Sequence, residues 1–172
     1  MAVDPGRVAL TGLIDRERFL GALDTALEKR VTLISAPAGS GKTSLLRTWI
    51  GRLPDVYRVV SVSARSEEDE QGFWLVLLAA FGAMGTPVPA PTFNGANMVD
   101  RVLTQLNENH NPIVIIVDDA HELTHDGLAH LAKFIADLPK HAHVVLSSRH
   151  DLRLGAHQLR LAGEVADAHG SA

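Results

Sequence analysis

The sequence predicts an α/β fold in which a mostly parallel, five-stranded sheet lies between two layers of helices. Short apolar runs rich in valine and isoleucine alternate with segments of helical period, as in successive βα units. The run "IVIIV" is β-branched throughout, which is typical of a strand buried on both faces. A glycine-rich stretch, "SAPAGSGKTSLL", stands between the first apolar run and the helix that follows it.

Composition and charge narrow the classes of function. The 172 residues suffice for one domain, which we divide into a lead-in segment with the first helix (1–29) and an α/β core (30–172). The absence of cysteine excludes disulfides and cysteine-ligated zinc and is typical of a cytoplasmic protein. No apolar run reaches the roughly 18 residues that suggest a membrane span. The net charge of −4 argues against binding nucleic acid through phosphate neutralisation.

The N-terminal third of the chain predicts a helix, a strand and a second helix. Residues 15–29 carry apolar side chains on one helical face, with Asp15 as the N-cap. Residues 30–35, "RVTLIS", form a buried strand. Residues 42–53, "KTSLLRTWIGRL", form a helix that is stopped at Pro54.

The middle of the chain predicts a strand at 57–63 and a helix at 72–84. That helix, "GFWLVLLAAFGAM", is so apolar that we expect it to be buried on more than one side. Three prolines and two glycines in residues 85–97 predict a loop. Another helix follows, because apolar residues recur at helical spacing from Met98.

The C-terminal part predicts a strand at 112–119, which ends in two aspartates, and a helix at 128–138 that Pro139 ends. Residues 141–149, "HAHVVLSSR", form a fourth strand, and residues 163–168 a weak fifth.

The glycine-rich stretch matches the phosphate-binding loop pattern GxxxxGK[ST], except that Ala36 replaces the first glycine. Glycines let the backbone curl so that its N–H groups point at phosphate oxygens. The following helix adds its positive N-terminal end, and Lys42 supplies a charge for the β- and γ-phosphates. We therefore predict a three-layer P-loop NTPase that binds ATP or ADP through these consecutive residues: Ala36, Pro37, Ala38, Gly39, Ser40, Gly41, Lys42, Thr43 and Ser44.

A phosphate-binding loop requires an acidic residue that holds Mg²⁺, and the strand "IVIIVDD" supplies one. Asp118 stands at the end of that strand, and the Thr43 hydroxyl is a second magnesium ligand. Asp119 can orient the attacking water or accept its proton. Arg149, at the tip of the fourth predicted strand, suits the γ-phosphate because a guanidinium fits a triphosphate terminus.

A zinc site is the alternative interpretation of the same region. His121, Glu122 and His125 match the metalloprotease pattern HExxH. That pattern requires both histidines to lie one turn apart on a formed helix, whereas here the helical pattern begins only near Asp126, with Thr124 as its cap. A third ligand at the spacing of the longer zinc-protease pattern is absent, so we disfavour zinc chemistry.

Four stretches together resemble the nucleotide-binding domain (NB-ARC/AAA-like) of the maltose-activator-like, large LuxR-type transcription regulators. They are "TLISAPAGSGKTSLLRTW", "VSVSARSEEDEQGFWLVLLAA", "IVIIVDDAHEL" and "VVLSSRHDLRLGAHQLRLAGE". The resemblance implies an ASCE/STAND-type signalling ATPase and, from "DRERFL", places Arg16 near the adenine end of the nucleotide site. The family often has an aromatic residue where Ser40 stands here.

The resemblance implies an ATP- and Mg²⁺-binding switch domain with slow hydrolysis at most, in which Lys42, Asp119 and Arg149 are catalytic. A module that holds nucleotide without turnover and uses it to oligomerise also fits. Regulators of this family continue into winged-helix, sensor and DNA-binding modules. This chain ends at Ala172, so we expect a domain fragment or a truncated relative. Its expected partners are nucleotide and, as an open option, a second copy of itself; DNA is reached only through the modules it lacks, and no membrane is involved.

Overall fold

The order and direction of the strands determine where the predicted motifs lie. The computed structural model describes residues 5–64, 70–82, 94–150, 152, 154 and 165–169, with side chains from residue 16 to residue 154. Its strands run in the order β2-β3-β4-β1-β5, and each neighbouring pair is parallel. The α/β class with a parallel sheet is therefore confirmed. The strands are β1 (Val31–Ser35), β2 (Arg58–Ser63), β3 (Ile113–Asp118), β4 (Ala142–Ser148) and β5 (Val165–His169).

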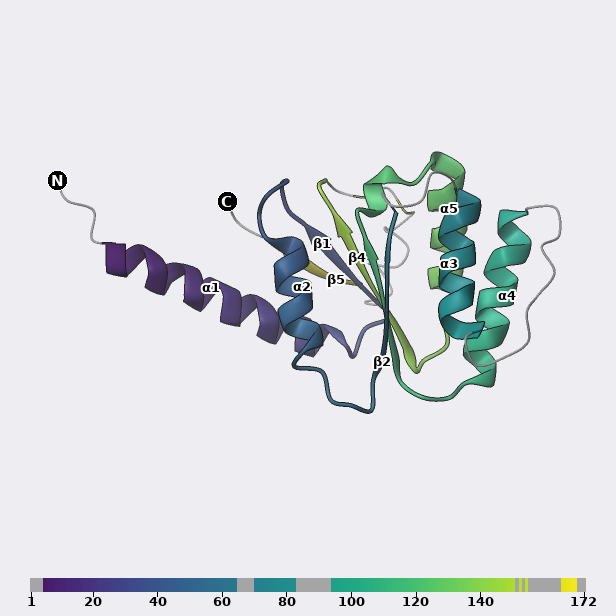
Figure 1. The fold of residues 1–172 in the computed structure, drawn as a ribbon, viewed down its shortest axis with the longest axis horizontal. Helices are drawn as coiled ribbons and strands as arrows, with labels where there is room; N and C mark the ends of the chain where they lie inside the picture. The colour runs from purple at the N-terminus through teal and green to yellow at the C-terminus, as the bar shows by residue number, and fades with distance from the viewer. Residues whose placement is uncertain are drawn as a thin grey trace.

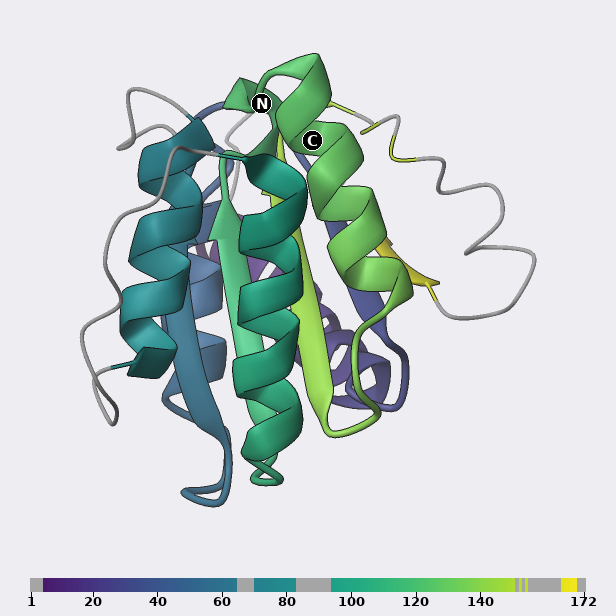
Figure 2. The ribbon, with the colours of Figure 1, turned by 90° about the vertical axis from the view of Figure 1, so that its right-hand side faces the viewer.

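Helices cover both faces of the sheet. In Figures 1 and 2, α3, α4 and α5 lie on one face, and α1 and α2 lie on the other. A short 3₁₀ helix, η1, follows β3 directly. The helices are α1 (Pro5–Ala26), α2 (Lys42–Ile50), α3 (Glu70–Gly82), α4 (Gly95–Glu108), η1 (Ala120–Glu122) and α5 (His125–Ala136).

The two faces of β3 explain why its sequence is β-branched without alternation. Ile115 and Val117 belong to the larger core, beneath α3, α4 and α5, whereas Val114 and Ile116 belong to the smaller core beneath α1 and α2. All four side chains are at most 1% exposed. A central strand of a three-layer fold is therefore buried on both sides, as its composition predicts.

Aromatic residues of α3 and α5 form the centre of the larger core. The Trp74 ring contacts Phe73 and Phe134 edge to face, with centroid distances of 5.1 and 5.7 Å. Such pairs stabilise a core beyond the area that they bury. On the outer side of α3, however, Leu75 and Val76 are each 40% exposed, so the expected burial of this helix on more than one side is only partial.

Helix α1 is fixed to α2 by polar contacts at its C-terminal end. The buried Trp49 donates from Nε1 to Asp24 Oδ1 over 2.8 Å, and Arg52 contacts both carboxylate oxygens of Glu17 at 3.0 and 2.5 Å. The N-terminal part of α1 extends away from the sheet in Figure 1.

Two predicted boundaries and one predicted N-cap require correction. The first helix begins at Pro5 and not at Asp15, because proline is well tolerated in the first turn of a helix. Asp15 is therefore internal and is not an N-cap. The predicted loop 85–97 ends earlier, since α4 begins at Gly95 behind Asn94, whose side chain accepts from the Asn97 amide. Residues 83–93 lie outside the described residues.

The insertion of β4 between β1 and β3 determines how the site is assembled. In a parallel sheet all carboxyl ends meet at one edge, and ligands bind outside that edge. At this edge the phosphate loop follows β1, Asp118 ends β3 and Asp119 follows it, and Arg149 follows β4. The strand order therefore places Arg149 between the phosphate loop and the acidic residues.

Candidate nucleotide site

The phosphate loop joins β1 to α2 and depends on its two glycines. Gly39 has φ 76° and Gly41 has φ 82°, which is the left-handed region that favours glycine. A Cβ at either position would meet no atom within 4 Å, so the constraint is conformational and not steric. Gly41 is the N-cap of α2, and the helix begins at Lys42. The first amides of α2 therefore face the loop, as anion binding at a helix N-terminus requires.

The loop is also fixed to the neighbouring strand. The Ala36 amide donates to the Ser148 carbonyl over 3.2 Å, which extends the pairing of β1 with β4 by one residue. Ala36 is 5% exposed, whereas the next five residues, Pro37 to Gly41, are exposed. A glycine at position 36 would gain nothing there, because Ala36 does not have a positive φ. The departure from the loop pattern is thus accommodated by the fold.

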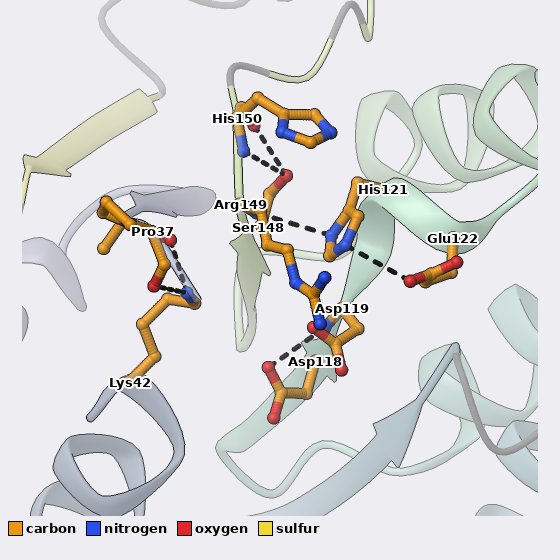
Figure 3. A network of polar contacts seen from close by, with 10 residues as sticks. Pro37, Lys42, Asp118, Asp119, His121, Glu122, Ser148, Arg149 and His150 are labelled. Carbon is orange, nitrogen blue, oxygen red and sulfur yellow. Dashed lines mark hydrogen bonds and ion pairs between the residues drawn. The ribbon is translucent and has the colours of Figure 1, made fainter. Parts of the chain in front are cut away.

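Lys42 turns its side chain back over the loop. Its ammonium group donates to the Pro37 carbonyl over 2.9 Å and also contacts the Ala36 carbonyl. Figure 3 shows it on one side of the site, across from Asp118 and Arg149. The ammonium group of the first residue of α2 thus lies against the backbone carbonyls of the loop.

Thr43 and Asp118 are 75 positions apart in the sequence and meet at the mouth of the loop. The Thr43 hydroxyl donates to Asp118 Oδ2 over 3.0 Å. Thr43 is in the first turn of α2, and Asp118 is the last residue of β3. A hydroxyl and a carboxylate oxygen side by side are ligands that Mg²⁺ accepts, with waters and phosphate oxygens completing its shell. The donor set therefore fits a magnesium ion.

Asp119 differs from Asp118 in its backbone conformation. Its φ of 52° and ψ of 38° are left-handed, and it is the non-glycine residue with positive φ among the described residues. Its amide donates to Asp118 Oδ1 over 3.0 Å. Aspartate and asparagine adopt this conformation more readily than other residues with side chains. This turn directs the chain from β3 into η1. Neither the turn nor η1 was predicted from the sequence.

Arg149 follows the last residue of β4. Figure 3 shows its side chain extending from the strand tip toward the carboxylates of Asp118 and Asp119. The side chain is partly exposed. The structure thus brings Lys42, Asp118, Asp119 and Arg149 to one edge of the sheet.

Arg16, a residue of α1, contacts α2 beyond the end of the phosphate loop. Its Nη2 atom donates to Thr48 Oγ1 over 2.8 Å and to Ser44 Oγ and the Ser44 carbonyl over 3.3 and 3.4 Å. These contacts place the guanidinium of α1 beside the exposed side of the first two turns of α2. Its expected role at the adenine end of the nucleotide stays a prediction.

The histidines of the HExxH pattern lie on two different helices. His121 is in η1, and His125 is the first residue of α5, which Thr124 caps by accepting from the Gly127 amide over 3.1 Å. The predicted break between the two histidines is therefore confirmed. Over the described ranges of the chain, no three histidine, aspartate or glutamate side chains gather in a metal-binding group.

The polar contacts at the end of β4 were not predicted. His121 Nδ1 accepts from the Arg149 amide over 3.4 Å, and Ser148 Oγ donates to the His150 carbonyl over 2.6 Å. Ser147 is fully buried, and its hydroxyl has no hydrogen-bond partner within the described structure. The available signal for Ser147 was the alternation of β4, which puts it on the same face as Val145, toward the phosphate loop.

Comparisons with known proteins agree with this geometry. A family model described as an AAA domain matches residues 26–154. The HTH-type transcriptional regulator MalT of Serratia proteamaculans (strain 568) is 23% identical over 168 residues, which cover 93% of this chain and 19% of that protein.

Two solved structures share the fold. Cdc6p from Pyrobaculum aerophilum superposes with a TM-score of 0.70 at 17% identity, covering 88% of this chain and 44% of that one. The Aeropyrum pernix ORC1 protein, solved in complex with DNA, gives a TM-score of 0.60 at 21% identity, with 97% and 45% covered. The chain thus spans about a fifth of its curated relative and less than half of each structure. Among the described residues no helix is long and apolar enough to cross a membrane.

Proposed function

The chain belongs to the AAA domain family, and from that premise we propose that it is the ATP- and Mg²⁺-binding switch domain of a LuxR-type transcription regulator of the STAND class. Hydrolysis is slow at most. The observation that carries the proposal is the hydrogen bond between Thr43 and Asp118, which closes the phosphate loop onto the acidic end of β3. A structural loop without a magnesium ligand would not need this pairing.

Each residue of the site has a distinct task in this proposal. Lys42 and the loop Ala36–Ser44 bind the phosphates, with the backbone amides that follow Pro37 as donors, and Arg16 lies toward the adenine end. Thr43 and Asp118 would hold Mg²⁺, which neutralises phosphate charge when it is bound. Asp119 orients a water molecule or accepts its proton, and Arg149 contacts the γ-phosphate. Arg149 is therefore the residue whose contacts differ between ATP and ADP.

Such a difference is what a switch requires. A ligand shifts a conformational equilibrium only to the extent that it binds the two states unequally. The similarity to MalT, an HTH-type transcriptional regulator, supports a role in transcription regulation, with DNA contacts made by other domains. Self-association of the nucleotide-bound form is the second part of this proposal, and nucleotide is its small-molecule partner.

Single-turnover hydrolysis measured beside equilibrium binding tests the proposal. The full chain, in excess over radiolabelled Mg·ATP, should bind the nucleotide and release phosphate slowly. Asp119→Asn should keep binding and lose phosphate release, because asparagine tolerates the left-handed backbone but cannot accept a proton. Binding with no phosphate release from the parent chain would favour the non-hydrolysing oligomerisation module instead. No binding at all would contradict both.

A further inference from the structure

His121 is a partly buried ionisable residue to which the proposed mechanism gives no task. Its side chain is only 8% exposed, although it lies in the short helix η1 at the edge of the site. The ring stacks edge to face against His150, with centroids 5.1 Å apart. A polar ring held in this way at the boundary of a site invites a functional explanation, because a leucine would pack there at a lower desolvation cost.

The contact that explains its position is a hydrogen bond to the backbone of Arg149. Pairing of β4 with β1 ends at Ser148, so the next amide, that of Arg149, has no partner in the sheet. His121 Nδ1 accepts from that amide over 3.4 Å. Figure 3 shows this bond linking the segment after β3 to the residue whose side chain extends toward the aspartates. The histidine therefore connects the acidic segment to the tip of β4.

The contact also specifies the tautomer of the ring. Because Nδ1 accepts, the proton of the neutral ring is on Nε2, which lies 3.4 Å from Glu122 Oε1. Burial lowers the pKa of His121; the carboxylates of Glu122 and Asp119 oppose this effect, and His150 and Arg149 add to it. The ring is thus neutral near pH 7, as an acceptor at Nδ1 must be.

We propose that His121 is a positioning residue for Arg149: it holds the Arg149 backbone at the tip of β4 and thereby sets the direction of the guanidinium, so that the preference of the domain for ATP over ADP depends on it. This inference rests on the proposed function, since it assigns the ATP preference to Arg149. The histidine itself touches no nucleotide in this account. Its effect is transmitted through one amide to one side chain.

Three variants of the full chain test the inference. His121→Leu removes the acceptor and keeps an apolar side chain of similar bulk. His121→Asn keeps an acceptor near the place of Nδ1. His125→Leu removes an exposed histidine four residues away and is the matched control. For each variant, the affinities for Mg·ADP and for the Mg complex of a non-hydrolysable ATP analogue are measured by calorimetric titration at pH 7.5.

We expect His121→Leu to lower the ratio of ATP-analogue to ADP affinity by about two- to tenfold, the range that one lost hydrogen bond gives. The affinity for Mg·ADP should stay within about twofold of the parent, since ADP has no γ-phosphate for Arg149 to contact. His121→Asn should restore most of the ratio, and His125→Leu should leave it unchanged. A ratio in His121→Leu equal to that of the parent would overturn the inference while leaving the proposed function intact. Absence of nucleotide binding in the parent would overturn both.

A spectroscopic measurement of the ring's protonation in the parent chain tests the proposed bond directly. In long-range ¹H–¹⁵N spectra of histidine-labelled protein at pH 7.5, His121 should show an unprotonated Nδ1 and a protonated Nε2. The Arg149 amide should exchange with solvent more slowly than in His121→Leu. A ring that is protonated at Nδ1 would contradict the proposed bond, whatever the affinities show.

Discussion

Asp118 and Asp119 are neighbours in sequence, but the backbone gives them different surroundings. Asp118 ends β3 in extended conformation and accepts from the Thr43 hydroxyl, whereas Asp119 turns into the left-handed region. The sequence could assign roles to the two aspartates only by their order after an apolar strand. The turn at Asp119 gives a physical reason for the division, because it separates the directions of two adjacent carboxylates.

Asp118→Asn should weaken the dependence of nucleotide binding on Mg²⁺. The amide keeps the size of the side chain but offers one neutral oxygen where a carboxylate would bind the ion. Titration of Mg²⁺ against nucleotide affinity should show at least about a tenfold weaker metal dependence, on the scale of about 1.4 kcal/mol per tenfold. Asp119→Asn, tested in parallel, should keep the parent dependence. Equal losses in both variants would mean that the two carboxylates share one role.

From the surroundings of His143 we predict how the free energy of unfolding depends on pH. This residue of β4 is 4% exposed. Its Nδ1–H donates to the Lys29 carbonyl over 2.6 Å, and its Nε2 is 2.9 Å from the Thr32 hydroxyl. Burial lowers its pKa below the 6.5 of an exposed histidine, and the bond to Lys29 opposes this effect. The folded protein therefore holds the ring neutral.

The sign of the pH dependence follows from the lowered pKa. Below about pH 6.5 the unfolded chain binds a proton that the folded chain resists, so the free energy of unfolding falls as the pH is lowered from that value. Above it, the contribution of His143 is constant. Urea unfolding of His143→Leu should give a lower stability at pH 7.5 but a shallower fall between about pH 7.5 and about pH 5.5, which is about one unit either side of the exposed value. His110→Leu, which removes an exposed histidine, should keep the parent slope.

At the level of elements, a polar contact joins α3 to α5 and lies against the first residue of α4. His130 of α5 donates from Nδ1 to Glu70 Oε1 over 2.5 Å, and Trp74 donates to the same oxygen over 3.1 Å. Gly95, the first residue of α4, lies against this pair. An added Cβ there would be 2.5 Å from His130 Nδ1 and 2.8 Å from Glu70 Oε1. Glycine is therefore favoured at position 95 because these two side chains leave no room for a Cβ, and not because of the backbone conformation.

Gly95→Ala should destabilise the fold by about 1–3 kcal/mol, the usual cost of forcing a methyl group into a packed site. Replacing His130 by alanine as well should recover much of that loss, because the obstructing ring is gone. Gly21→Ala is the matched control: nothing lies within 4 Å of its Cβ position in α1, and alanine should stabilise that helix by up to about 1 kcal/mol. Thermal unfolding of these three variants and of the parent measures these differences. Equal behaviour of the two glycine variants would contradict the packing described here.

The helix termini show which local features a sequence reveals. Thr124 was predicted as a cap from its residue type and position, and its hydroxyl does accept from the Gly127 amide. The 3₁₀ helix Ala120–Glu122 was not predicted, because it depends on the left-handed turn at Asp119, which no composition signal marks. The early start of α1 at Pro5 was also missed, since Thr11 and Gly12 interrupt the apolar pattern. A short pattern thus identified the cap at Thr124, but the same reasoning failed at Asp15, which is internal to α1.

For the whole molecule, the sequence predicted the parts of the site better than their arrangement. Lys42, Thr43 and Asp118 were identified from two motifs, and the similarity to MalT together with the AAA domain match confirms the family resemblance. The place of β4 between β1 and β3 depends on its pairing with β1, more than a hundred residues earlier, which no local pattern encodes. That order is what brings Arg149 beside the aspartates and His121 beside Arg149.

The central claim is that nucleotide binds at the phosphate loop, and calorimetric titration of Lys42→Ala tests it most directly. The parent chain should bind one Mg complex of a non-hydrolysable ATP analogue. Lys42→Ala should weaken that binding by at least about tenfold, because a hydrogen bond to a charged group contributes about 1.5–3 kcal/mol. Lys140→Ala removes the same charge from the turn before β4, at the opposite edge of the sheet, and should bind like the parent. Undiminished affinity in Lys42→Ala would contradict the account.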